Sequence, residues 1–207
     1  MTPFRRRAQP VFWAAKEAQW LGSDRTANPL TWQHETKTLA FWFQKLARAE
    51  GEPADRCAYC EAPLRDASRA TTDHFYPRGE FPEWALTWIN LFPACDQCNS
   101  VHKRDQWSCR ILRPDEPQVD EFFAFDPLTG RVEPNPSRPA RDRARARVTA
   151  RVLGLNTAER RHARLRCWRD LSNAWKAPDH DLVRACAAQG PYRFVGQWFL
   201  RSVAPIS

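Results

Sequence analysis

The sequence lacks any apolar run that approaches the roughly 18 residues of a membrane-spanning helix. The basic residues 5–7 are followed by an apolar stretch only at residues 11–15, which ends at Lys16. That stretch is too short for the hydrophobic core of a secretory signal peptide. Internal repeats and long low-complexity tracts are also missing. We therefore expect a cytoplasmic protein, with one main domain and no membrane partner.

A disulfide framework is equally unexpected, because seven cysteines is an odd number and a reducing compartment favours metal binding instead. Four of them form two C-x2-C pairs, Cys57 with Cys60 and Cys95 with Cys98. Each pair can place two thiolates on one tight turn, and two such turns complete the tetrahedral S4 shell that suits Zn²⁺. With four protein ligands this zinc is structural. The alternatives are a redox pair or coincidental buried cysteines.

The formal net charge of +8 is concentrated in one part of the chain. Residues 138–170 hold eleven arginines against three acidic residues, so the remainder is balanced. Such a block indicates a polyanionic partner, most simply nucleic acid. The alternative is the solvated helix face of an arginine-rich protein.

Four segments can be separated by pattern. We expect an N-terminal helical segment with a helix over 31–51, a zinc-bound core, a Pro-rich connecting loop with a turn at 126–130, and an Arg-rich helical region. In the same order, these four segments cover residues 1–52, 53–112, 113–139 and 140–207. In the last segment, Asn156 and Glu159 predict a capping box and Asp179 predicts a helix cap.

The stretch between the cysteine pairs predicts a compact unit. Residues 71–76 are rich in β-formers and end at a proline, and residues 88–92 predict a second strand. Asp96 can cap a following helix that carries Asn99 in its first turn. The expected fold class is therefore α+β and mostly helical, with a small zinc-stapled core between flanking helices.

Asp73 and His74 are adjacent on the first predicted strand, so their side chains leave on opposite faces. Together with Asn90 and Asn99, and framed by the cysteine pairs, they resemble the ββα-metal motif of HNH endonucleases. The wider segments 57–61, 73–79 and 88–100 resemble the HNH nucleases that accompany retrons and the Septu anti-phage system.

The resemblance implies a role for each motif residue. His74 would be the general base that deprotonates water, and Asp73 and Asn99 would hold one Mg²⁺ or Mn²⁺ through oxygen ligands. The divalent ion would stabilise charge on the phosphate and on the leaving 3′-oxygen. Asn90 would orient His74 or brace the loop without touching the metal.

Three basic residues, Arg78, Lys103 and Arg104, flank this motif and are expected to contact phosphates. One departure from the family stands here: relatives usually carry a lysine three residues after the helix asparagine, where this chain has His102, with Lys103 next. His102 either reaches the metal or a phosphate, or is a surface histidine.

The function that the resemblance implies is metal-dependent hydrolysis of DNA in anti-phage defence, together with an ATPase partner of the SMC-like or ABC type. Two alternatives stay open, the first of them from a different class. One is a zinc-stapled nucleic-acid-binding module without catalysis, and the other is a stand-alone restriction-type nuclease. A scaffold for the ATPase would leave the motif unexplained.

Overall fold

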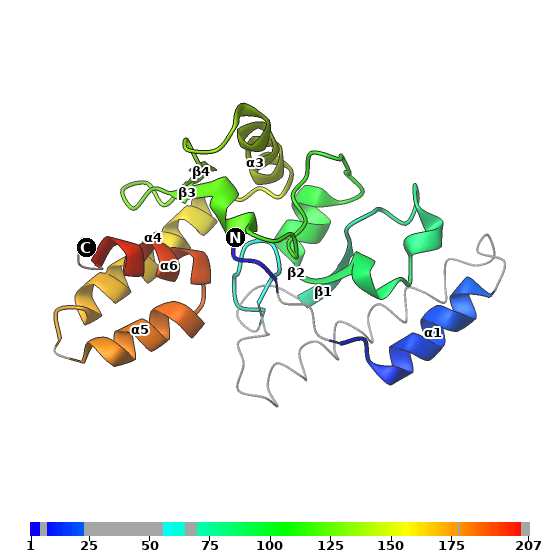
Figure 1. Ribbon diagram of the computed structural model, residues 1–207, viewed down its shortest axis with the longest axis horizontal. Coiled ribbons are helices and arrows are strands. Elements are labelled where there is room, and N and C mark those ends of the chain that lie inside the picture. Colours follow the sequence, from blue (N-terminus) through cyan, green and yellow to red (C-terminus); the bar gives the residue numbers. More distant parts are fainter. Residues whose placement is uncertain (5–7, 23–55, 65–69, 178, 204–207) are drawn as a thin grey trace.

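The computed structural model describes residues 1–4, 8–22, 56–64, 70–177 and 179–203 (Figure 1). The helix expected over 31–51 lies outside these residues. Helices and short two-stranded sheets are mixed in the described part, which confirms the α+β class. None of the described helices has the length and apolar character needed to cross a membrane. Helix α1 (Val11–Leu21) packs beside the short turn Trp88–Asn90.

Strands β1 (Ala70–His74) and β2 (Leu91–Cys95) form an antiparallel pair in which Asp73 lies opposite Phe92. The second strand begins later than the expected 88–92, because Trp88–Asn90 form a single helical turn. The N–H of Asn90 closes that turn by donating to the Thr87 carbonyl over 2.8 Å. All five residues of β2 are buried, so this strand lies at the centre of the unit.

A short helix of π geometry, Gln97–Lys103, follows β2 directly. The N–H of Arg104 donates to the carbonyl of Asn99, five residues earlier, over 2.6 Å. Asp96 precedes this helix but makes no side-chain capping bond, so the expected cap is wrong. The helix does carry Asn99 near its start, as predicted.

The segment expected as a Pro-rich loop contains a hairpin of β3 (Phe123–Phe125) and β4 (Val132–Pro134). Its turn lies at residues 126–130 as predicted, because the N–H of Gly130 donates to the Asp126 carbonyl over 2.8 Å. Gly130 has a φ of +70°, and a Cβ there would lie 2.4 Å from the Arg161 carbonyl oxygen. Only glycine combines this backbone conformation with this close approach.

The C-terminal region consists of helices α3 (Ala140–Val152), α4 (Ala158–Ala174), α5 (His180–Gln189) and α6 (Arg193–Val203). The side chain of Asp179 caps α5, accepting from the Leu182 N–H over 3.0 Å as predicted. The expected capping box at Asn156 is wrong. Its amide instead bonds both backbone groups of Val132, at 2.9 and 2.8 Å, and ties β4 to the start of α4.

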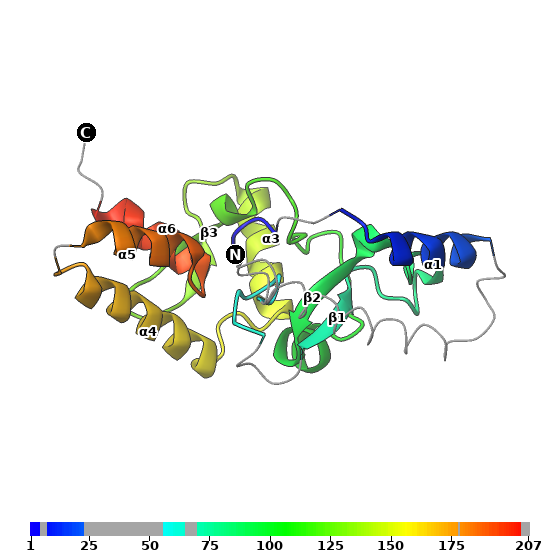
Figure 2. The same cartoon turned by 90° about the horizontal axis from the view of Figure 1, so that it is seen from below.

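Helices α4, α5 and α6 lie together at one end of the molecule, away from α1 (Figures 1 and 2). One buried cluster nevertheless joins the cysteine segment to the C-terminal region. It includes Tyr59, Cys95, Phe123, Leu153 and Val195. The C-terminal helices therefore help to hold the β1–β2 unit through a shared apolar core.

Candidate metal centre and active site

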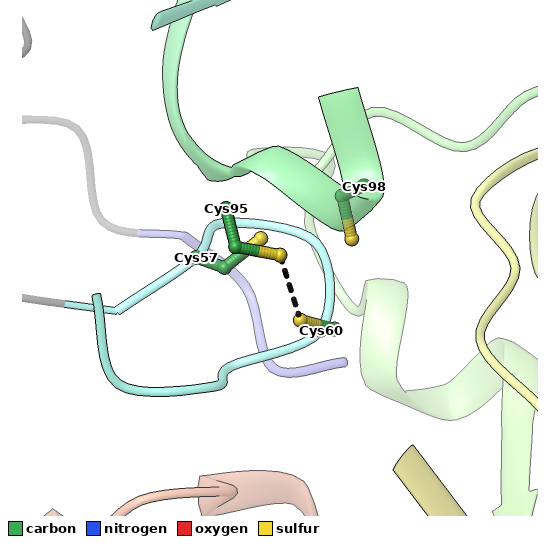
Figure 3. A group of neighbouring side chains, drawn as sticks. All are labelled: Cys57, Cys60, Cys95 and Cys98. Carbon is green, nitrogen blue, oxygen red and sulfur yellow. Dashed lines mark hydrogen bonds between the residues drawn. The ribbon is translucent and has the colours of Figure 1, made fainter. Parts of the chain in front are cut away.

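The four paired cysteines converge on one point (Figure 3). Their sulfur atoms all lie within 4.8 Å of one another, and Cys60 Sγ is 3.7 Å from Cys95 Sγ. A tetrahedral Zn²⁺ with Zn–S bonds of about 2.3 Å needs sulfurs about 3.8 Å apart. Cys57 and Cys60 come from the turn before β1, Cys95 ends β2, and Cys98 lies in the π helix. The arrangement fits a structural zinc that pins three elements together.

The thiol chemistry of this cluster also fits a cation. Burial raises the pKa of the Cys57 and Cys98 thiols, because a thiolate there loses its hydration, whereas hydrogen bonds with neighbouring cysteines, Cys57 first, lower the pKa of Cys60 and Cys95. A divalent cation held by the four sulfurs would supply the missing positive charge and favour the thiolate forms. Four sulfur ligands leave no open position for catalysis.

A buried arginine from α4 completes the surroundings of the cluster. Arg160 Nη2 donates to Cys98 Sγ over 3.1 Å, and the same guanidinium bonds the carbonyl of Gly154 over 2.7 Å. Hydrogen bonds of this kind orient metal ligands and offset the negative charge of four thiolates. Nothing in the sequence distinguished Arg160 from the other arginines of its block.

Asp73 lies at the end of β1 with only 2% of its surface exposed. Its Oδ1 accepts from Lys103 Nζ over 3.1 Å, and its Oδ2 accepts from the hydroxyl of Tyr59. Tyr59 lies between Cys57 and Cys60 in the sequence, so the turn that carries these two cysteines also positions this tyrosine beside Asp73. Sequence reasoning missed Tyr59, and its place inside a C-x2-C pair is the only signal for it.

The expected phosphate contact at Lys103 is wrong, because the side chain is fully buried. Its ammonium bonds Asp73 and also the main-chain carbonyl of His74, over 2.6 Å. The π winding explains the departure from the family pattern. A π turn holds about one more residue than an α turn. The fourth residue after Asn99 therefore lies at nearly the angle around the helix axis that the third residue would have in an α-helix. The π winding therefore turns Lys103 toward β1, where it meets Asp73.

Replacing Lys103 with methionine should lower the free energy of unfolding by about 3–5 kcal/mol, because Asp73 would remain buried without a cationic partner. Burial already raises the pKa of Asp73 against the opposing charge of Lys103. The added change Asp73→Asn should recover part of the loss, measured by urea denaturation as a double-mutant cycle. The exposed Lys176→Met is the matched control, expected within about 0.5 kcal/mol of wild type. If Lys103→Met lowered the free energy of unfolding as little as the control does, a stabilising ion pair between Lys103 and Asp73 would be contradicted.

His74 is held by a hydrogen bond between its Nε2 and the carbonyl oxygen of Ala85, at 2.8 Å. Since the carbonyl only accepts, Nε2 carries the proton, and the lone pair of the neutral ring is on Nδ1. Burial lowers the pKa of His74 to about 4; the Ala85 bond raises it and the charge of Arg78 lowers it. The ring is therefore neutral near pH 7.

Asn90 is fully buried and holds the loop that follows β1. Its Oδ1 accepts from the N–H of Tyr76 over 2.7 Å, and its Nδ2 donates to the carbonyls of Tyr76 and Trp84 over 3.1 and 3.0 Å. Trp84 directly precedes Ala85, which bonds His74. Asn90 thus fixes the loop that orients the histidine.

Asn99 is tied to β1 through its amide nitrogen, which donates to Thr71 Oγ1 over 3.0 Å and to the Thr72 carbonyl over 3.3 Å. Its Oδ1 is the atom left for a cation. An ionised Asp73 has about four lone-pair sites, of which Lys103 and Tyr59 use two. The oxygens of Asp73 and Asn99 are the hard donors that suit Mg²⁺ or Mn²⁺.

The remaining flanking residues differ in exposure. Arg78 is half-buried, and Arg104 is exposed just after the π helix. The ring of His102 packs on Gly154: a Cβ there would lie 2.5 Å from the ring, and the φ of +57° also requires glycine. His102 therefore connects the π helix to the link between α3 and α4.

Comparison with known sequences agrees with this site. Residues 57–105 match the profile of the HNH endonuclease family. The chain is 37% identical to a Septu protein PtuB of Bacillus thuringiensis over 46 residues, which are 22% of this chain and 18% of that protein. It is 27% identical to the Retron Ec83 putative HNH endonuclease of Escherichia coli over 150 residues, covering 52% of this chain and 58% of the relative.

A second Septu protein PtuB, from Bacillus mycoides strain KBAB4, is 27% identical over 90 residues, covering 35% of this chain and 30% of the relative. The matched part is thus less than two thirds of each relative's length. The HNH match includes both cysteine pairs, Asp73, His74, Asn90 and Asn99.

Proposed function

We propose that this chain is a metal-dependent endonuclease that hydrolyses phosphodiester bonds of DNA. The observation that carries the proposal is the hydrogen bond from His74 Nε2 to the Ala85 carbonyl, which leaves the lone pair of the ring on Nδ1. A neutral, oriented imidazole beside an acidic residue is suited to deprotonate water. A binding module without catalysis has no need for such an arrangement.

In this mechanism His74 Nδ1 takes a proton from water, and the resulting hydroxide attacks the phosphorus. The 3′-oxygen leaves, so the products carry 5′-phosphates and 3′-hydroxyls. Asp73 and Asn99 would hold the divalent cation, which supplies electrostatic stabilisation of the phosphate and the leaving oxygen. Lys103 and Tyr59 position the Asp73 carboxylate, and Asn90 positions the loop behind His74.

The biological setting is proposed from the relatives. Two of them are Septu proteins and one is named a retron putative HNH endonuclease, and on this similarity we propose a role in anti-phage defence. We propose an ATPase of the SMC-like or ABC type as its partner and the cytoplasm as its location.

Relaxation of supercoiled plasmid tests the proposal. The purified chain, alone and with a co-encoded ATPase, should convert supercoiled plasmid to nicked circles in Mg²⁺ or Mn²⁺. Addition of EDTA should stop cleavage, and excess Mg²⁺ should restore it, because oxygen ligands release the catalytic ion more readily than four sulfurs release zinc. Equal cleavage in EDTA would contradict the metal dependence. DNA binding without cleavage in any of these mixtures would favour the binding module.

A further inference from the structure

Two adjoining hollows lie between α3 and the segment that follows the HNH motif. They have volumes of about 540 and 430 Å³ and share Arg110 in their walls. The helix α3 contributes residues three or four positions apart, which form one face of a helix. These residues are Arg141, Ala144, Arg145, Val148, Arg151 and Val152. We call the two hollows together the α3 groove.

The arginines that line the α3 groove differ in whether they form ion pairs. Arg145 makes a two-point ion pair with Glu116, with both distances 2.8 Å. The side chains of Arg110, Arg141 and Arg151 are exposed, and within the described ranges none has a carboxylate at ion-pair distance. These three charges are therefore available to an external anion.

Two arginines of the block at residues 138–170 have a structural role. Arg160 and Arg164 of α4 are buried, the first against the cysteine sulfurs and the second against the carbonyls of Gly130 and Leu155. These two buried arginines therefore stabilise the fold. The exposed charges of the α3 groove need another explanation.

One end of the α3 groove reaches the active-site region. Trp107 lines that end, and its ring lies 5.6 Å from the ring of Tyr76, two residues beyond His74. Asp105 and Glu80 also line this end, so net positive charge increases toward Arg141. Arg141 and Arg151 are ten residue steps apart, about 15 Å along α3, which is the axial rise of about four nucleotides of one strand of duplex DNA.

We propose that the α3 groove binds the phosphate backbone of the DNA substrate and leads it to His74, with Arg110, Arg141 and Arg151 as the contacts. This inference rests on the proposed nuclease function and specifies where its substrate lies. Contacts of this kind position a strand without reading its sequence. The groove also predicts that substrate binding depends on α3 and not on the exposed face of α4.

Binding is best measured in the His74→Ala background, so that the probe stays intact. The probe is a fluorescently labelled 30-base-pair duplex, and anisotropy is recorded over a series of salt concentrations. Adding Arg141→Glu and Arg151→Glu should weaken binding by about tenfold or more, and the log–log salt dependence should become shallower by about two. The matched control is Arg169→Glu, an exposed arginine on α4 outside the groove.

The double change Arg141→Gln and Arg151→Gln, with zinc content and melting temperature checked, separates charge from folding. Its loss should be smaller than that of the glutamate pair but still exceed the control's. The proposal that the α3 groove binds DNA would be overturned if both double variants had the same affinity and the same salt dependence as the Arg169→Glu control. If the double variants bind DNA like the control but protein with His74 intact cleaves plasmid, the nuclease proposal stands and only the proposed role of the α3 groove is refuted. Failure of plasmid cleavage with normal groove-dependent binding would refute the nuclease proposal alone.

Discussion

Replacing His74 with alanine should slow DNA cleavage by about 10²- to 10⁴-fold, the usual contribution of a positioned general base. The physical reason is specific to this ring. Its Nε2 is bonded to the Ala85 carbonyl, so the lone pair that accepts the proton of water is on Nδ1. The measurement is the single-turnover rate on a labelled duplex in saturating Mn²⁺, with enzyme in excess.

The control for this change is His162→Ala, which removes an exposed imidazole from α4. His162→Ala should cleave at the wild-type rate and keep the wild-type melting temperature. Both variants should retain zinc, but His74→Ala should melt at a lower temperature, because it removes a buried ring and leaves the Ala85 carbonyl without its hydrogen bond. DNA binding should also be unchanged in His74→Ala, because the ring acts on water and not on the strand. A His74→Ala rate within twofold of wild type would show that another group is the base.

Replacing Cys98 with serine should remove the bound zinc and unfold the β1–β2 unit. Structural zinc contributes about 10–16 kcal/mol in small zinc domains, which exceeds the whole stability of a typical domain. The effect should spread to the C-terminal region, because Cys98 also accepts from Arg160 of α4 and the two regions share one core. Zinc content by elemental analysis and the thermal unfolding transition measure both parts.

Two exposed cysteines provide the matched comparison. Cys109→Ser and Cys186→Ser make the same chemical change outside the cluster and should leave zinc content and melting temperature unaltered. A Cys98→Ser protein that keeps stoichiometric zinc and melts as wild type would contradict the four-sulfur site.

Local spacing was sufficient to predict much of the core. The two C-x2-C pairs predicted the sulfur cluster because each pair lies on one turn, and only the pairing of β1 with β2 was needed to join them. Asp179 and the turn at 126–130 were predicted for the same reason, since their bonds reach only three or four residues along the chain.

The wrong expectations at Asn156 and Lys103 depend on contacts distant in sequence or on unusual winding. Asn156 has the residue type of a helix cap, but β4 lies close enough to take both of its amide bonds. Lys103 looked like a surface cation because a regular helix was assumed. The π winding turns it inward to Asp73, thirty residues earlier in the chain.

Tyr59 and Arg160 show the same limit for the site. The residue type alone does not distinguish either of them, and only the tertiary structure brings Tyr59 to Asp73 and Arg160 to the cysteine sulfurs. The roles of His74, Asp73, Asn90 and Asn99 in catalysis remain proposals that rest on their geometry and on the HNH match.

The most direct test of the nuclease proposal is the chemistry of the cut ends. A duplex of defined sequence is incubated with the wild-type chain in Mg²⁺ or Mn²⁺, with and without the proposed ATPase partner, and the products are analysed by mass spectrometry. Hydrolysis through His74 predicts fragments with 5′-phosphates and 3′-hydroxyls, absent from the His74→Ala reaction. Fragments ending in 3′-phosphate, or the same fragments from His74→Ala, would contradict the proposed active site.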